Sequence, residues 1–125
     1  MWKELCWLGL AGAAGTLSRF TVAGLLQSLA GERFPAGTLA VNLIGCFLFG
    51  LVWSLADERL IISGHTRFII LTGFMGAFTT FSTFGFETAE LLRRAEWWQA
   101  AGNMLINNAG GIAGVFLGWG AGRWL

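Results

Sequence analysis

Four long apolar stretches, separated by short charged segments, constrain what this chain can fold into. Each stretch can hold a helix of about 20 residues, the length that crosses the hydrocarbon core of a bilayer. The segments between them leave no room for a separate soluble domain. The sequence therefore predicts an all-α membrane protein, a single domain over residues 1–125, with four transmembrane helices at about 5–30, 36–56, 68–92 and 98–124.

The composition fits a lipid surrounding and excludes several classes of function. Hydrophobic residues make up 55% of the chain and charged residues 12%, which is too apolar for an ordinary soluble domain. The net charge of +1 offers no basic surface, so nucleic acid is not expected as a partner. No nucleophile, base and acid occur within reach of one another in any span, and we expect a protein that is not an enzyme.

The Lys and Arg residues are divided almost evenly between the two sides of the predicted bundle. Orientation in the membrane follows the Lys/Arg bias of short loops, so a small excess gives little preference. Two interpretations stay open: one orientation set by a single extra charge, or chains in both orientations, which permits an antiparallel dimer. The side with the termini holds Lys3, Arg59, Arg67 and Arg123, and the other side holds Arg33, Arg93 and Arg94.

Glycines recur every four residues in the fourth stretch, which places them on one helix face. Overlapping GxxxG patterns let two helix backbones approach closely in a membrane. We expect this face to pack tightly on another helix. The residues are Gly110, Gly114, Gly118 and Gly122.

Several uncharged polar side chains lie inside the predicted spans, where an unsatisfied polar group is costly. Thr38 and Asn42 are one helical turn apart in the second span. Asn103, Asn107 and Asn108 lie in the fourth span. These three amides are expected either to bridge helices or to line a wet path.

Charged groups in the spans are few. Arg19 lies more than halfway along the first span, so it either extends back to the interface or faces a water-filled vestibule as a fixed positive charge. Glu87 and Glu90 share a helix face near the end of the third span, where we expect them to stay hydrated and to carry no transported proton. No acidic group inside the spans is then expected to compete for an anion.

The segment GFMGAFTTFSTFGFE, residues 73–87, is a poor helix inside an apolar span. Gly73 and Gly76 cost helix stability, and the Thr, Ser and Phe residues that follow are mediocre helix formers. Freed backbone groups in a bilayer are tolerated only where protein, ions or water satisfy them. We therefore predict a local unwinding of the third helix that serves an ion site.

Phenylalanines recur through the same segment at helical spacing. Wherever the helix persists they form an aromatic stripe, which serves either packing or, with the interleaved hydroxyls, the wall of a pore. They are Phe74, Phe78, Phe81 and Phe84.

These motifs resemble one known family. The combination of GTLAVNLIG at 37–45, GFMGAFTTFSTF at 73–84 and an Arg late in the first of four spans is similar to the Fluc (CrcB) family of bacterial fluoride channels. The resemblance covers nearly the whole chain. It implies a fluoride-selective channel that exports fluoride passively and protects the cell from it. It also implies a multi-pass protein of the bacterial inner membrane, assembled as an antiparallel, dual-topology homodimer around a central structural Na⁺.

The resemblance also assigns roles to residues. The Na⁺ would be held by the backbone carbonyls of Gly76 and Thr79. Fluoride is small and strongly hydrated, so a selective path must replace its water with amide N–H groups, hydroxyls and the electropositive edges of aromatic rings. The fluoride path would be lined by Phe81, Phe84, Asn42, Thr38, Ser82, Thr83 and Asn107, with Asn108 as a further polar group and Arg19 in the vestibule.

Two other classes of protein compete with a channel. Small multidrug-type proton-coupled exporters also have four spans, but they resemble one another in a membrane-embedded Glu on the first helix, and here Glu4 lies at its very start. A non-transporting scaffold needs only the glycine faces and leaves Arg19, Asn42 and the block of hydroxyl and phenylalanine residues without a role.

Overall fold

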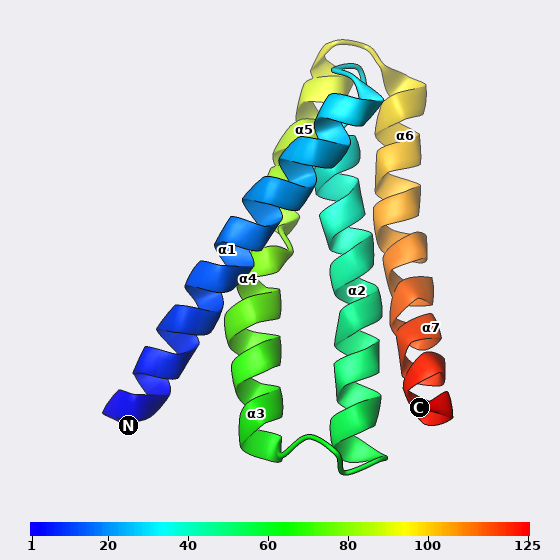
Figure 1. Cartoon of the computed structure of the whole chain (residues 1–125). Coiled ribbons are helices and arrows are strands. Elements are labelled where there is room, and N and C mark those ends of the chain that lie inside the picture. Colours follow the sequence, from blue (N-terminus) through cyan, green and yellow to red (C-terminus); the bar gives the residue numbers. More distant parts are fainter.

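The computed structural model describes residues 1–125 and contains four helical rods and no strands. The rods lie side by side, with both termini and the α2–α3 connection at one end and the other two connections at the opposite end (Figure 1). The first rod is α1 (Trp2–Ala30) and the second is α2 (Ala36–Asp57). The third comprises α3 (Gly64–Phe68), the π-helical η1 (Ile69–Met75), α4 (Gly76–Phe78) and α5 (Phe81–Arg93), and the fourth α6 (Trp97–Leu105), the π-helical η2 (Ile106–Gly110) and α7 (Gly111–Trp124).

The prediction of an all-helical chain with four helices is confirmed, and two of the rods are long and apolar enough to cross a membrane. These are Ala36–Asp57, with a mean hydropathy of 2.1, and Gly64–Arg93, with 1.4. The first and fourth rods have the length but are less apolar, because Arg19 lies in one and three asparagines lie in the other.

Gln27 holds the connection between α1 and α2. Its side-chain Nε2 donates to Phe34 C=O at 2.9 Å, and its Oε1 accepts from the Gly37 N–H at 3.0 Å. Gly31 ends α1 with φ +83, a conformation that glycine adopts without the strain of a Cβ. The tight turn sets α1 obliquely across the third rod and α2 (Figure 1).

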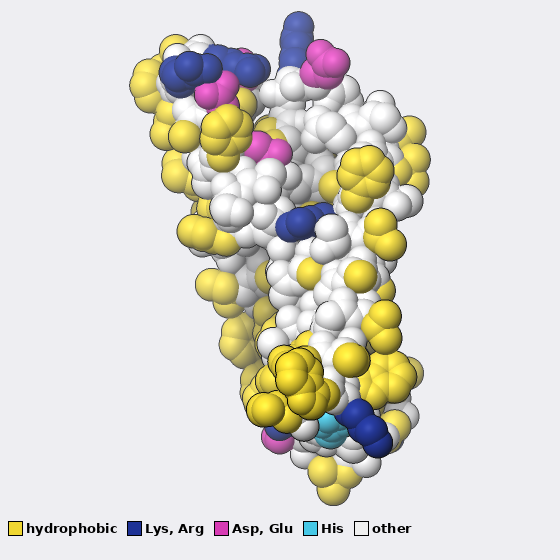
Figure 2. Space-filling model, turned by 90° about the vertical axis from the view of Figure 1, so that its left-hand side faces the viewer, with side chains coloured by type: hydrophobic (Ala, Val, Ile, Leu, Met, Phe, Trp, Pro, Cys, Tyr) yellow, Lys and Arg dark blue, Asp and Glu magenta, His cyan; other side chains and the backbone are white.

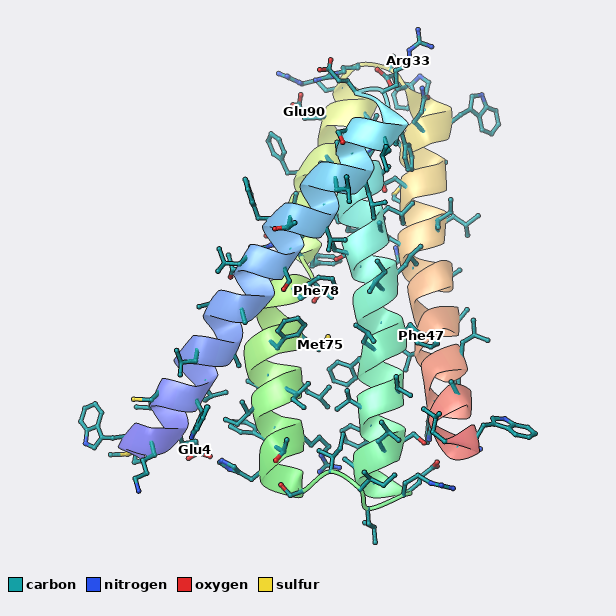
Figure 3. The ribbon with its side chains drawn as sticks, in the orientation of Figure 1. Glu4, Arg33, Phe47, Met75, Phe78 and Glu90 are labelled. Atoms are coloured by element: carbon teal, nitrogen blue, oxygen red, sulfur yellow. The ribbon has the colours of Figure 1, made fainter.

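The glycine face of α7 packs on α2, as the four-residue spacing predicts. At Gly118 an added Cβ would lie 1.9 Å from Phe47 C=O, and at Gly50 on α2 it would lie 2.0 Å from Val115 C=O. The two backbones are therefore in direct contact, which only residues without a side chain permit. Phe47 lies on α2 beside this contact (Figure 3).

A cluster around Glu58 joins the end of α2 to the end of α7. Its carboxylate accepts from Arg123 Nε at 2.9 Å, from Trp119 Nε1 at 2.8 Å and from Ser54 Oγ at 3.0 Å. These donors, the Arg123 guanidinium above all, lower the pKa of Glu58 to about 2.

Few side chains are buried by one chain alone. Only 21 of 125 residues are buried, and Met75 and Phe78 are directed from the third rod towards α2 (Figure 3). Apolar side chains cover the flanks of the molecule, whereas most charged groups gather near its two ends (Figure 2). This distribution matches a lipid environment with water at both ends.

Candidate functional site

The helical backbone of the third rod is interrupted at two residues. Thr79 (φ −89, ψ 159) and Thr80 (φ −150, ψ 109) are extended, so α4 ends at Phe78 and α5 begins at Phe81. Thr80 caps α5, because its Oγ1 accepts from the Thr83 N–H at 3.2 Å. The interruption therefore lies within the threonine pair of the segment that the sequence marks as a poor helix.

The side-chain amide of Asn42 on α2 bonds to both the N–H and the C=O of Thr80 in the interrupted backbone. The Thr80 N–H donates to Asn42 Oδ1 at 2.8 Å, and Asn42 Nδ2 donates to Thr80 C=O at 3.2 Å. The Asn42 oxygen thus takes the place of the helical acceptor that the Thr80 N–H has lost, and the Asn42 N–H adds a bond to the N-cap carbonyl. We infer that Asn42 and the interruption depend on each other.

The interruption releases backbone carbonyls. In a continuous helix the Thr80 N–H would bond to Gly76 C=O, and the Thr83 N–H would bond to Thr79 C=O. Here the first donates to Asn42 and the second to the Thr80 hydroxyl. The carbonyls of Gly76 and Thr79 are left without their helical donors.

Two of the three asparagines of the fourth rod, Asn103 and Asn107, bridge helices. Asn42 Nδ2 also donates to Asn107 Oδ1 at 3.0 Å, and Asn107 Nδ2 donates to Asn103 Oδ1 at 2.9 Å. Asn103 Nδ2 then donates to Thr88 Oγ1 on α5 at 3.0 Å. Asn108 stays outside this chain and donates to Met104 C=O on its own helix at 2.7 Å.

A first cavity of about 310 Å³ opens beside the interruption. It brings together four of the residues expected in the pore and one expected at the Na⁺ site. Amide, hydroxyl and aromatic groups therefore line one space, and Asn42 and Asn107 both bridge helices and face it. The wall comprises Asn42, Thr79, Phe81, Phe84 and Asn107, together with Gly45, Cys46, Phe49, Thr80, Asn108 and Val115.

A second cavity of about 440 Å³ lies between α1, α2 and α5 and holds the remaining expected polar residues except Ser82. Arg19, Thr38 and Thr83 line it. Thr80 lines both cavities, so the interrupted backbone separates them. The residues expected on one path are thus divided between two spaces on either side of Thr80.

The four phenylalanines form two pairs in place of one stripe. Phe74 stacks on Phe78 with ring centroids 5.7 Å apart, before the interruption. Phe81 and Phe84 follow it, tilted by 57° with centroids 5.5 Å apart. Phe84 is buried, whereas 79% of Phe81 is exposed on the single chain.

Glu87 is less hydrated than its position in the sequence suggests. It is half-buried and lines the second cavity beside Arg19 and Thr38. Thr38 Oγ1 donates to Glu87 Oε1 at 2.8 Å, and the buried Oε2 has no partner. The expectation that Glu87 stays hydrated is therefore wrong for its buried oxygen, because α5 turns this carboxylate inward towards α2.

Ser82 and Gly76 lie away from both cavities. Both are exposed on the single chain, as is most of Phe81. Ser82 follows Phe81 at the start of α5, where its backbone N–H has no acceptor within the helix. Polar backbone and side-chain groups therefore face outwards next to the interruption.

Fold and site together define a small all-helical membrane protein with a polar and aromatic cavity at an interrupted helix. The chain belongs to the CrcB family: residues 6–119 match the family described as CrcB-like protein, Camphor Resistance (CrcB). This membership separates it from the small multidrug-type exporters.

Relatives in several bacteria carry one name, fluoride-specific ion channel FluC. The protein of that name from Nitrosococcus oceani is 58% identical over 119 residues, which are 95% of each chain. The one from Solidesulfovibrio magneticus is 46% identical over 123 residues, 98% of each chain. The one from Magnetococcus marinus is 38% identical over 120 residues, which are 96% of this chain and 98% of that one.

Proposed function

We propose that this chain forms a fluoride-selective channel through which fluoride leaves the cell passively across the bacterial inner membrane. One observation carries the proposal: amides, hydroxyls and phenyl rings line a cavity at the interrupted helix of a chain that is 58% identical to a protein named fluoride-specific ion channel. The name of the relatives indicates fluoride as the ion, and the groups that line the cavity suit this anion.

The cavity offers fluoride several weak donors and no ammonium or guanidinium group. The ring edges of Phe81 and Phe84 carry partial positive charge, and α5 begins beside them with backbone N–H groups that have no helical acceptor. The N-terminus of a helix favours negative charge. Weak ligands suit conduction, since the ion must leave as readily as it enters.

Asn42 can bind a passing ion only by breaking one of its hydrogen bonds within the protein. Both N–H groups of its amide are engaged, one by Thr80 C=O and one by Asn107 Oδ1. To donate to a passing ion, Asn42 must give up one of these bonds. The ion then replaces a partner of similar strength, which limits how tightly the site holds it.

Arg19, Thr38 and Thr83 line a vestibule on the other side of Thr80. A fixed positive charge at its wall raises the local concentration of anions. The Glu87 carboxylate in the same space opposes that effect and leaves the charge balanced. Ser82 is exposed on the single chain, and in our proposal it lines the path where a second chain packs against it.

The functional unit in this proposal is an antiparallel homodimer of two four-span chains. Exposed polar groups at the interruption support it, because Gly76, Ser82 and the edge of Phe81 would otherwise face lipid. The nearly even distribution of Lys and Arg permits insertion in both orientations.

A structural Na⁺ at the centre of the dimer fits the released carbonyls. Those of Gly76 and Thr79 lack helical donors, and oxygen ligands suit a hard cation. One chain supplies too few of them, and the partner would supply the matching pair. When bound, the ion would offset part of the cost of bringing an anion into a low dielectric.

Fluoride efflux tests the proposed activity. Liposomes that hold only the purified protein and are loaded with fluoride should empty when a potassium ionophore compensates the charge, while matched liposomes loaded with chloride retain their anion. Equal loss of both anions would refute selectivity, and retained fluoride would refute the channel.

Cysteine labelling tests dual topology. Ile61 is exposed in the α2–α3 connection, so Ile61→Cys in a chain without Cys6 and Cys46 gives one reporter. An impermeant reagent added outside cells should label a substantial share of the chains and leave the rest for labelling after lysis. Labelling that is complete from one side, or absent from it, would contradict antiparallel assembly.

A further inference from the structure

A continuous chain of hydrogen bonds connects the interrupted backbone to the interior of α5, with one branch at Asn107, whose Nδ2 also donates to Asn103 C=O at 3.0 Å. It begins at the Thr80 N–H, passes through three asparagine side chains of α2, η2 and α6, and reaches Thr88. Thr88 Oγ1 closes it by donating to Phe84 C=O at 2.8 Å. Thr88 and Asn103 are buried, 7% and 1% exposed, and neither lines a cavity described above.

Both ends of this chain have a fixed polarity. The Thr80 N–H can only donate, and Phe84 C=O can only accept. A hydroxyl that donates its proton to the carbonyl must accept from Asn103, so Asn103 presents its NH₂ to Thr88 and its oxygen to Asn107. The same reasoning fixes every later amide, and a flip of any one of them would set two donors or two acceptors against each other.

We propose that Thr88 and Asn103 are positioning residues for the pore. Resting on the proposed function, the inference assigns them the task of keeping the Asn107 and Asn42 amides in place, so that these support the Thr80 backbone. They act through these amides and contact no ion. The aligned bonds also polarise one another, which strengthens the hold on the peptide at the interruption.

Thr88 can be tested without touching the cavity wall, because Asn103 lies between it and Asn107. Thr88→Val keeps the shape of the side chain and removes the acceptor of the Asn103 NH₂, whereas Thr88→Ser keeps the hydroxyl. An unsatisfied buried N–H predicts a fall of about fivefold or more in fluoride flux for the valine variant. The serine variant should remain close to wild type.

Thr21→Val is the matched control. The Thr21 hydroxyl donates to Leu17 C=O at 3.0 Å, the same bond to the preceding turn that Thr88 makes, but it is exposed and has no second partner. Its flux should equal that of wild type. A general effect of replacing helical threonines would lower both valine variants alike and would overturn the proposal.

A readout independent of flux separates this inference from the proposed function. In protein with ¹⁵N-labelled asparagine, Thr88→Val should shift the side-chain amide signals of Asn107 and Asn42, and Thr88→Ser should not. If the wild type moves no fluoride, the proposed function fails and this spectrum still decides whether the chain of bonds exists. Unshifted signals would overturn the positioning role.

The dimer must survive the substitution for either readout to count. Elution on size exclusion shows this directly. If Thr88→Val does not assemble, Thr88→Cys takes its place, because a thiol is a weak acceptor of similar volume. Wild-type flux in whichever of the two assembles would refute the proposal.

Discussion

The contact between α2 and α7 allows a sharp prediction about stability. Gly118→Ala adds a Cβ that would lie 1.9 Å from Phe47 C=O and 2.9 Å from the Leu51 N–H nitrogen, whereas real Cβ contacts are essentially never below 3.0 Å. Both obstacles are backbone of another helix, so no rotamer change relieves them. The two helices must separate by about 1 Å, and overpacking of this kind costs about 1–3 kcal/mol.

Gly120→Ala is the matched control on the same helix. A Cβ there meets no atom within 4 Å, and alanine is the better helix former by about 1 kcal/mol. In the purified protein in detergent, followed by tryptophan fluorescence, Gly118→Ala should lower the melting temperature by something on the order of 10 °C. Gly120→Ala should leave it unchanged or raise it. Equal melting temperatures for the two variants would refute the argument that backbone contact holds α2 against α7.

Three further predictions concern the pore, the cation and pH. Phe81→Ile and Phe84→Ile remove the aromatic edges and keep apolar bulk, so fluoride flux from liposomes should fall by about an order of magnitude. Phe74→Ile, before the interruption, should conduct normally, and loss of dimer elution in the first two variants would instead make their rings structural. Exchange of sodium for a large organic cation should abolish flux or dissociate the dimer, and indifference after prolonged exchange would rule out a structural Na⁺. Because the pKa of Glu58 is lowered to about 2 from its ordinary value of 4.5, its contribution to stability is complete above pH 4.5 and is lost as pH falls towards 2. Thermal scans should show this loss, and Glu58→Gln should remove that part of the pH dependence.

The apolar pattern predicted the helical rods, and the glycine spacing predicted the surface of α7 that packs on another helix. The four-residue spacing of glycine in α7 is a local signal, and the packing on α2 follows from it directly. The interruption at Thr79 and Thr80 also lies inside the segment marked by weak helix formers. Gly73 has a different reason from the one expected, since a Cβ added there would lie only 2.8 Å from the Cβ of Ala11 on α1.

The hydrogen-bond partners of the polar side chains could not be predicted from the sequence. Asn103 and Thr88 meet only because α5 and α6 turn particular faces to each other, and that rotation depends on tertiary packing rather than on local spacing. Glu87 was misjudged for the same reason, because its distance from the end of the span suggested water and the rotation of α5 gave it Thr38 instead.

The one-way amide chain has a consequence for what the wall of the pore can conduct. A proton moves along hydrogen bonds only where each group can take up a proton on one side and release another from the other, as water and hydroxyls do. An amide nitrogen carries no acceptor lone pair, so the run of Asn42, Asn107 and Asn103 cannot pass a proton onward. The backbone N–H at one end and the carbonyl at the other are equally inert. The side of the cavity that these three amides support therefore offers no hydrogen-bonded route for a proton.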